Sequence, residues 1–303
     1  MNKTENIINQ INSQNLVILE GAISVLSALS SRYAKIAKII LKSDFENIKN
    51  IQKILTAAKE KNIKTEYFSP GEFKAFEENI NKSDLYSLGR THGGIVALAQ
   101  KRRFLTPEDL LSQISHTAAV SIAVIEGIED PYNLGYAVRA LYTQGVGGLI
   151  LPERDFGFSE SVIEKASTGT FSKMPIAVFP NSNSPNNPNS PDNPKTELLK
   201  LLKNNGFTIY CIDKKAPANT KFKVTDIFGV KFADRTVFII GGEKRSISKD
   251  FLYNADEIVR IPYANDFPHS LAAQTAATII SYEIHRQFIS FQRRSPKTTN
   301  KRF

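Results

Sequence analysis

The sequence predicts an α/β protein: a parallel sheet in the second half of the chain, preceded by a smaller α/β domain. The central stretch is 122–151, where an apolar run, a polar loop, an apolar-periodic segment ending at Gly145 and a second apolar run follow one another. Strand, helix and strand within about 30 residues is the size of a βαβ unit, which builds parallel sheets. Predicted strands at 208–212 and 236–240 continue the pattern.

Length and composition set the limits. The 303 residues are enough for two domains, and 41% hydrophobic and 23% charged residues are ordinary for a globular protein. One cysteine, Cys211, excludes an internal disulfide framework and fits a reducing compartment. The N-terminus has no apolar signal core, and no apolar run approaches the roughly 20 residues of a membrane span. We therefore expect a cytoplasmic protein without a membrane segment.

The formal net charge of +9 is unevenly distributed. Residues 1–118 hold 16 Lys/Arg against 12 Asp/Glu, and residues 119–303 hold 23 against 18. From Arg286 onward there are six basic residues and no acidic one. Positive charge therefore gathers in the front domain and the tail, where it attracts nucleic acid without sequence preference. Basic tails are also common on proteins that bind no nucleic acid, so this signal alone is weak.

The first half alternates predicted strands and helices. Residues 1–15 are polar, and we expect a flexible N-terminus there. Residues 16–29 are interpreted as a helix with Ile23, Leu26 and Leu29 on one face. The alternation predicts a small α/β domain at 16–104. Its other predicted elements are strands at 38–41, 64–68 and 94–98 and helices at about 47–61 and 71–78.

Two segments of this domain are candidates for RNA contact. The loop Arg-Thr-His-Gly-Gly at 90–94 precedes the last strand. His92 either contacts an RNA backbone or is a turn histidine held by local hydrogen bonds. The basic hinge at 101–103 leads out of the domain. The candidate RNA-binding residues are Arg90, His92, Lys101, Arg102 and Arg103.

Residues 105–119 are predicted as a linker with a short helix, and 120–288 as the second domain. Within it, 181–194 is dense in Asn, Pro and Ser, which cannot form a core, so we expect a surface loop. Residues 289–303 are the basic tail. Four scattered histidines and one cysteine predict no metal site, and neither a Gly-x-Gly-x-x-Gly pattern nor a P-loop occurs. The remaining predicted elements are helices at 159–168, 196–205 and 272–288 and a strand at 175–179.

The polar loop of the βαβ unit carries the most distinctive chemistry. The Asp-Pro pair at 130–131 is a turn signal, and Asn133 is a good N-cap. Arg139 follows within two turns, where the helix dipole disfavours a positive charge. A bound phosphate explains it, because a guanidinium pairs well with phosphate oxygens. The alternatives are an arginine paired with Glu129 or Asp130, or one that is simply solvated.

Two further loops follow predicted strands. Gly241 and Gly242 come after 236–240, interpreted as a buried strand at the edge of the sheet, and glycines let a backbone approach a ligand closely. His-Ser-Leu at 269–271 precedes the last helix, where Ser270 is also a plausible N-cap. Open α/β sheets bind ligands at the carboxyl ends of their strands. We expect the loops to gather there.

These three blocks, in this order, resemble the SpoU/TrmH family of RNA ribose 2′-O-methyltransferases within the SPOUT superfamily. The first matches the family's Asp-Pro-x-Asn-x-Gly-x-x-x-Arg at 130–139, the second its Gly-x-Glu at 241–243, and the third its last block at 261–271. Lys-Ala-Ser-Thr-Gly at 165–169 also resembles a family signature. Residues 20–103 are similar to the family's small ribosomal-protein-like substrate-binding domain.

The resemblance implies a SPOUT-type parallel sheet with a C-terminal trefoil knot, one of the rare exceptions to unknotted topology. It implies that 16–104 binds RNA, that 120–288 binds S-adenosylmethionine and that the protein is a homodimer. Catalytic roles fall on Asn133, Arg139, Glu243 and Ser270. Cofactor contacts fall on Gly241, Gly242, Ile261 and Leu271.

The implied reaction is an in-line methyl transfer to a ribose hydroxyl, in which positioning supplies much of the acceleration. Because a guanidinium is not deprotonated in proteins, we interpret Arg139 as a phosphate clamp and leave the proton acceptor open. Glu243 and Asn133 would hold the arginine and its loop. The sequence departs from the family at Ala272, where an Asn is usual, and at 244–246, where Lys-Arg-Ser replaces a glycine-rich continuation.

The expected function is therefore S-adenosylmethionine-dependent ribose 2′-O-methylation of structured RNA, with rRNA ahead of tRNA. Structured RNA exposes its 2′-hydroxyls in a shallow groove and in loops. The alternative is a catalytically weak or inactive RNA-binding or ribosome-assembly protein with the same fold, because the amide usual at position 272 is missing. A third reading, a small-molecule α/β enzyme, would need a different anion for Arg139.

Overall fold

The computed structural model describes residues 3–45, 48–82, 88–89, 92–154, 159–180, 193–216, 222–242 and 246–294 of the chain. The chain divides into two compact units. Unit 1 comprises Met1–Phe104, Asp130–Arg139 and Asp155–Met174; unit 2 comprises Leu105–Glu129, Ala140–Arg154 and Pro175–Phe303.

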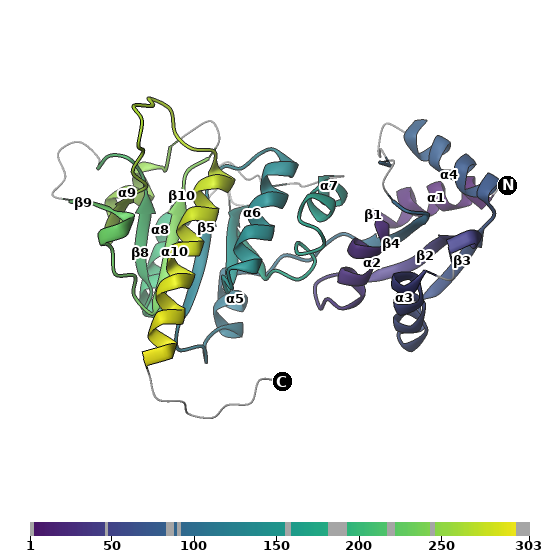
Figure 1. Ribbon diagram of the computed structural model, residues 1–303, viewed down its shortest axis with the longest axis horizontal. Coiled ribbons are helices and arrows are strands. Elements are labelled where there is room, and N and C mark those ends of the chain that lie inside the picture. The colour runs from purple at the N-terminus through teal and green to yellow at the C-terminus, as the bar shows by residue number, and fades with distance from the viewer. Residues whose placement is uncertain are drawn as a thin grey trace. The chain divides into compact units, whose positions relative to one another are not determined.

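Unit 1 is built on a four-stranded mixed sheet in the order β1-β4-β2-β3 (Figure 1). Its central strand β4 runs antiparallel to both β1 and β2, whereas β2 and β3 are parallel. The strands are β1 Leu16–Glu20, β2 Ile36–Lys42, β3 Lys64–Phe68 and β4 Ile95–Gln100. The helices are α1 Lys3–Gln14, α2 Gly21–Leu29, the 3₁₀ turn η1 Ser43–Phe45, α3 Lys49–Glu60, α4 Pro70–Lys82 and α7 Ser159–Ala166.

Both faces of this sheet are covered, which explains the continuous apolar runs of β1 and β4. Side chains alternate along a strand, so Leu16 and Ile18 join the cluster formed with α1 and α4, while Val17 and Leu19 join the one formed with α2 and α3. A strand that buries side chains on both faces of the sheet shows no alternation of apolar and polar residues. The strands predicted at 38–41, 64–68 and 94–98 are confirmed, with small shifts of their ends.

Two expectations for the N-terminal segment were wrong. Residues 1–15 were expected to be flexible, but α1 occupies most of them and buries Ile7 and Ile11, one helical turn apart. Residues 16–29 were interpreted as one helix, but their first five form β1. The boundary is Gly21, whose φ of 82° lies in the left-handed region that glycine adopts without strain.

Unit 2 is built on a seven-stranded sheet in the order β7-β6-β5-β10-β8-β11-β9, and every pair of neighbours is parallel. The predicted parallel sheet is confirmed. The strands are β5 Val120–Ile125, β6 Gly148–Pro152, β7 Ile176–Phe179, β8 Thr208–Ile212, β9 Val224–Asp226, β10 Arg235–Ile240 and β11 Glu257–Arg260. The helices are α5 Pro107–Gln113, α8 Pro194–Asn204, the 3₁₀ turn η2 Ile227–Gly229, α9 Lys249–Asn254 and α10 Ala273–Arg294; α6 Pro131–Thr143 spans the boundary between the units.

Helices cover both faces of this sheet as well. On one face α5, α8 and α9 close a core with β5, β10 and β8 that includes Val124, Val237 and Cys211. On the other face α10 packs against β10 and β5 (Figure 1) and buries Ala277, Ile280 and Ile284. The strand at 236–240 was interpreted as an edge strand, which was wrong: β10 lies near the middle, paired on both sides.

Several features of the predicted βαβ unit are confirmed. β5 and β6 are parallel neighbours, and α6 connects them. Gly145 has a φ of 73°, and its N–H donates to the carbonyl of Tyr142 while that of Val146 donates to Leu141. This is the pattern of bonds that ends a helix at a left-handed glycine. The loop expected at 181–194 falls almost wholly outside the described residues, as does 295–303 of the basic tail.

Within the described ranges, no helix combines the length and the apolar character that crossing a bilayer would take. The same ranges hold no group of three or more His, Cys, Asp or Glu side chains arranged to bind a metal ion.

Candidate functional site

The polar loop that precedes α6 is ordered by Asp130. Its carboxylate accepts a hydrogen bond of 2.8 Å from the N–H of Asn133, and the helix begins at Pro131. An aspartate before a helix with proline at its first position is a strong start signal. The expectation that Asn133 caps the helix was therefore wrong: Asn133 lies inside the first turn, half-buried.

Arg139 lies on the exposed face of α6. Leu134, Val138 and Leu141 form the buried face, and Tyr132 and Tyr136 share the exposed one. Within the described residues Arg139 has no hydrogen bond and no ion pair, so pairing with Glu129 or Asp130 does not account for it. Two readings from the sequence remain: a solvated arginine and an arginine that meets an anion.

Gly135, the glycine of the first block, is required by packing. A Cβ at this position would lie 2.5 Å from the Cβ of Ala166 and 2.9 Å from the carbonyl oxygen of Ile163. The first turns of α6 therefore rest directly on α7, which fixes the helix that carries Asn133 and Arg139. In the Gly-x-x-x-Arg block, the glycine is therefore needed for packing against α7, whereas the arginine is exposed to solvent.

In unit 2 the carboxyl ends of β5 and β10 touch through two glycines. A Cβ added to Gly242 would lie 2.7 Å from both the Cα and the carbonyl oxygen of Gly127. Close backbone contact is one reason for glycine at 242, in addition to the predicted approach of a ligand. Gly241 is half-buried beside it. Glu243, the predicted catalytic carboxylate, lies outside the described residues.

Glu126, the first residue after β5, is a functional candidate that sequence reasoning missed. Its carboxylate is paired with the ammonium of Lys195 on α8 and accepts a hydrogen bond of 2.7 Å from the N–H of Ser248. It therefore ties the end of β5 to the segment that follows Gly241 and Gly242. The available signal was a carboxylate placed directly after a fully buried strand.

The third block forms the loop between β11 and α10. Ile261 and Leu271 are half-buried and Ser270 is exposed. The N–H of Leu271 donates to the hydroxyl of Tyr263 over 2.9 Å. The sequence also suggested Ser270 as the N-cap of the last helix. This was wrong, because α10 begins only at Ala273.

The N-cap position of α10 belongs to Ala272. Its carbonyl accepts hydrogen bonds from the N–H groups of Thr275 and Ala276, as the residue before a helix does. The asparagine usual here in the resembled family would supply a side-chain acceptor for the first turn, and alanine has none. The departure therefore removes a helix cap beside the predicted site.

Sheet order adds a fourth loop to the three that the sequence predicts. β8 lies between β10 and β11, so its carboxyl end, followed by Asp213 and Lys214, lies between the loops that carry Gly241 and Ile261. Chain order does not reveal this neighbourhood, because β8 precedes β10 and β11 in the sequence.

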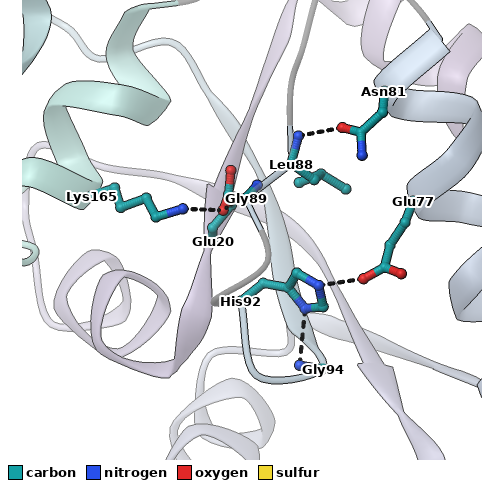
Figure 2. A network of polar contacts seen from close by, with 8 residues as sticks. All are labelled: Glu20, Glu77, Asn81, Leu88, Gly89, His92, Gly94 and Lys165. Carbon is teal, nitrogen blue, oxygen red and sulfur yellow. Dashed lines mark hydrogen bonds and ion pairs between the residues drawn. The ribbon is translucent and has the colours of Figure 1, made fainter.

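His92, a candidate for RNA contact, is held within unit 1. Its Nδ1 accepts a hydrogen bond of 3.0 Å from the N–H of Gly94, and its Nε2 faces the carboxylate of Glu77 (Figure 2). Its ring also lies 5.3 Å from that of Phe73. Since both ring nitrogens have partners, the structure favours the turn histidine over the RNA contact. Arg90 lies outside the described residues.

A carboxylate of β1 binds the backbone of Gly89, which precedes this turn in the chain. Glu20 accepts hydrogen bonds from the ammonium of Lys165 on α7 over 2.9 Å and from the N–H of Gly89 over 3.1 Å (Figure 2). Lys165 belongs to the segment at 165–169 that resembles a family signature. In this structure the lysine of that segment has a partner inside unit 1.

The three residues of the basic hinge differ in exposure. Lys101 is half-buried and Arg103 is exposed, so both stay predictions as RNA contacts. Arg102 is only 8% exposed, and its guanidinium donates to the carbonyl oxygens of Phe171 and Met174. The prediction that Arg102 binds RNA was wrong, because its side chain is buried and bonded within unit 1.

Two glutamates of α7, Glu160 and Glu164, lie close to the buried Arg102 and form a charged cluster with it. Glu160 accepts a hydrogen bond of 2.9 Å from the N–H of Arg102, and Glu164 accepts one of 2.9 Å from the N–H of Ser172. Burial lowers the pKa of Arg102 to about 10 and raises the pKa of Glu164 to about 7. Within the described residues, Nε of Arg102 and Oε1 of Glu164 are buried without a hydrogen-bond partner.

Comparisons with known proteins define the class. Residues 121–282 match the SpoU rRNA Methylase family, and residues 18–105 match the family described as RNA 2'-O ribose methyltransferase substrate binding. Because the first match covers more than half of the chain, the chain belongs to the SpoU rRNA methylase family. The resemblance read from the three blocks is thereby confirmed.

The relatives agree with this class. A putative TrmH family tRNA/rRNA methyltransferase of Staphylococcus epidermidis is 26% identical over 274 residues, which cover 89% of this chain and 96% of that protein. An uncharacterized tRNA/rRNA methyltransferase of Synechocystis is 28% identical over 197 residues, or 65% of this chain. The matched stretch spans only 46% of the length of the Synechocystis protein.

Two solved structures share the fold. The SpoU methyltransferase AviRb of Streptomyces viridochromogenes, determined with its cofactor AdoMet, has a TM-score of 0.65 at 20% identity, covering 93% of this chain and 94% of that chain. An AdoMet-bound rRNA methyltransferase of Sinorhizobium meliloti has a TM-score of 0.65 at 16% identity, covering 92% of this chain and 90% of that one. At these identities the likeness shows a common fold.

Proposed function

We propose that this protein transfers a methyl group from S-adenosylmethionine to a ribose 2′-hydroxyl of structured RNA, with rRNA ahead of tRNA. The observation that carries the proposal is the first block: its asparagine and arginine lie on one helix of a chain that belongs to the SpoU methylase family. Arg139 is exposed, without a protein partner among the described residues. A match over residues 18–105 to a substrate-binding family supports RNA as the acceptor.

The cofactor would be held by the loops after β10, β8 and β11. Three adjacent parallel strands end at one edge of the sheet, where open α/β folds bind ligands. Gly241 carries no side chain that would fill this space, and the half-buried Ile261 and Leu271 offer apolar contact for a purine base. These residues fit S-adenosylmethionine, which when bound supplies an electrophilic methyl group on a sulfonium.

The protein's own side chains would orient the acceptor. A ribose hydroxyl is a weak nucleophile, so its approach must be fixed in line with the methyl group. Arg139 would grip the adjacent phosphate with two parallel hydrogen bonds, because a planar guanidinium matches phosphate oxygens. Asn133 would hold the loop, and Glu243 and Ser270 complete the catalytic set that the family resemblance implies.

Further proposals follow from the same family membership. We propose a homodimer and a C-terminal trefoil knot, and the cytoplasm stays the predicted location. Exposed aromatic residues on two helices, Tyr132, Tyr136 and Tyr142 on α6 and Tyr282 on α10, support the dimer, because tyrosine is enriched at protein interfaces. Multi-angle light scattering would give about twice the chain's 33.8 kDa.

The alternative function is an RNA-binding or ribosome-assembly protein without methylation. It is favoured by one observation: Ala272 supplies no cap to the first turn of α10, next to Ser270 and Leu271. Isothermal titration with S-adenosylmethionine separates the two functions. Heat of binding supports the enzyme, whereas RNA binding without cofactor binding supports the alternative.

The deciding experiment measures the product. RNA from cells with and without the gene is digested, and 2′-O-methyl groups are mapped by mass spectrometry. A ribose methylated only in the presence of the gene, and restored by the wild-type gene but not by an Arg139→Ala variant, supports the proposal. Identical maps, together with no methyl transfer in vitro to rRNA or tRNA, would refute it.

A further inference from the structure

The loop between β11 and α10 is held by a residue from a different strand. Lys214 follows β8, and its ammonium lies 4.3 Å from the ring centroid of Tyr263 and 5.9 Å from that of Phe267. The same ammonium donates to the carbonyl oxygen of Phe267 over 3.2 Å and to that of His269. One side chain therefore makes four contacts with three residues of this loop.

The loop is also closed upon itself. The hydroxyl of Tyr263 accepts the hydrogen bond of the Leu271 N–H over 2.9 Å, which joins the two ends of the 263–271 segment. The ring of Tyr263 thus meets Lys214 on its face and Leu271 at its hydroxyl. Phe267 lies 6.3 Å from Tyr263 and 5.4 Å from His269, ring centroid to ring centroid. These contacts form one connected cluster.

Burial does not fix the shape of this segment. Residues 264–270 are all exposed, and Phe267 is 49% exposed despite its ring contacts. A segment with few buried apolar contacts opens locally at low free-energy cost unless specific interactions close it. The cation–π contacts and the carbonyl contacts of Lys214 are such interactions.

We propose that Lys214 is a positioning residue that holds the 263–271 loop in the shape that binds S-adenosylmethionine. The inference rests on the proposed function and extends it, because Lys214 lies outside the three blocks. Sheet order gives the reason: β8 lies between β10 and β11, so a residue after β8 reaches the loop after β11. Lys214 acts through Tyr263 and the backbone of Leu271, the predicted cofactor contact.

The test compares three variants of the full-length protein. Lys214→Met keeps the length of the side chain and removes its charge, Lys214→Arg keeps a cation, and Lys215→Met changes the exposed neighbour as a matched control. We expect Lys214→Met to weaken S-adenosylmethionine binding about tenfold, since loss of a cation–π contact and charged hydrogen bonds is on that order. Lys214→Arg should restore most of the affinity, and Lys215→Met should match wild type.

Steady-state kinetics adds a readout that a merely structural role would not move. With RNA in excess, Lys214→Met should raise the KM for S-adenosylmethionine about tenfold and leave kcat within about twofold, because a saturating ligand re-forms the loop. Tyr263→Phe removes only the hydroxyl that closes the loop, and we expect a smaller loss of affinity, about threefold. Melting temperatures of all variants should stay within about 2 °C of wild type.

The outcomes separate this inference from the proposed function. If the wild-type protein binds RNA but no S-adenosylmethionine by titration, the proposed function fails, and the inference fails with it. If wild type binds the cofactor and Lys214→Met binds it equally tightly, the function stands and the inference is overturned. If Lys214→Met does not fold, Tyr263→Phe decides: unchanged affinity overturns the inference and reduced affinity supports it.

Discussion

Two arginines of this protein have opposite surroundings. Arg102, in the basic hinge, is buried among Tyr33, Phe171 and two glutamates of α7, and its guanidinium donates to backbone carbonyls. Arg139, on α6, is exposed and has no partner among the described residues. A buried guanidinium with its partners supplied stabilises the fold, whereas an exposed one is available to a ligand. Residue type alone therefore does not identify an RNA contact.

The variant Arg102→Met tests whether the buried arginine stabilises the fold, and we expect it to have the largest effect. It leaves two glutamates buried without their cation, so we expect a loss of about 3–5 kcal/mol in the free energy of unfolding. Urea denaturation followed by circular dichroism measures the loss. Arg103→Met is the matched control, because the adjacent side chain is exposed, and it should change stability by less than about 0.5 kcal/mol. Equal effects of the two variants would contradict the structural role of Arg102.

The converse variant is Arg139→Ala. It should leave the free energy of unfolding within about 0.5 kcal/mol of wild type, because the side chain is exposed. Methyl transfer to RNA should fall by about 100-fold or more, since a charged group that orients the reacting atoms contributes on that order. Transfer of labelled methyl groups at saturating cofactor measures this. RNA affinity, measured by filter binding, should stay within a few fold, and undiminished transfer would exclude Arg139 from the reaction.

A third test concerns the charge of the buried cluster. Burial raises the pKa of Glu164 from its usual 4.5 to about 7. Between these values the folded protein holds a proton that the unfolded chain has lost, so the contribution of Glu164 to stability is complete below about pH 4.5 and is lost as the pH rises through 7. We expect wild type to lose roughly 1–3 kcal/mol between pH 5 and pH 8 through this group. Glu164→Gln, compared at both pH values, should remove that loss; an unchanged difference would show that Glu164 ionises without cost.

The smallest expected effect lies in unit 2, at the N-cap of α10. Ala272→Asn restores a side-chain acceptor for the first turn, and we expect a gain of about 1 kcal/mol in the free energy of unfolding. Thermal unfolding measures it, with Ala273→Asn as the control one position further into the helix, where no gain is expected. A rise in methyl transfer with the gain in stability would show that the missing cap also weakens the site.

Much of the architecture could be predicted from local patterns. The βαβ unit was recognisable because apolar runs, the Asp-Pro pair and Gly145 give independent signals for the strands, a turn and a helix end. The start of the helix was misplaced at Asn133, whereas α6 begins at Pro131. β1 was misread for a physical reason. A strand covered on both faces has no period of two, so Leu16–Glu20 looks like the first turns of the helix that follows.

The site was only partly predictable for a similar reason. Local signals locate the blocks at 130–139, 241–243 and 261–271, which all lie within the residues 121–282 that the family model matches. Lys214 gives no such signal, because the loop that it contacts follows a different strand, β11. Glu126 gives only a general signal, a carboxylate directly after a buried strand. The position of Arg102 in a basic hinge wrongly suggested an RNA contact, because its partners Glu160 and Glu164 lie about 60 residues away in the sequence.

By itself the sequence determined the class of protein, the parallel sheet and the helix that carries Asn133 and Arg139. Those properties follow from periodicity, capping residues and short motifs, which are local. The tertiary structure decided which charges are buried and which loops share an edge of the sheet. Burial and strand order depend on contacts between distant segments, and no local pattern encodes them.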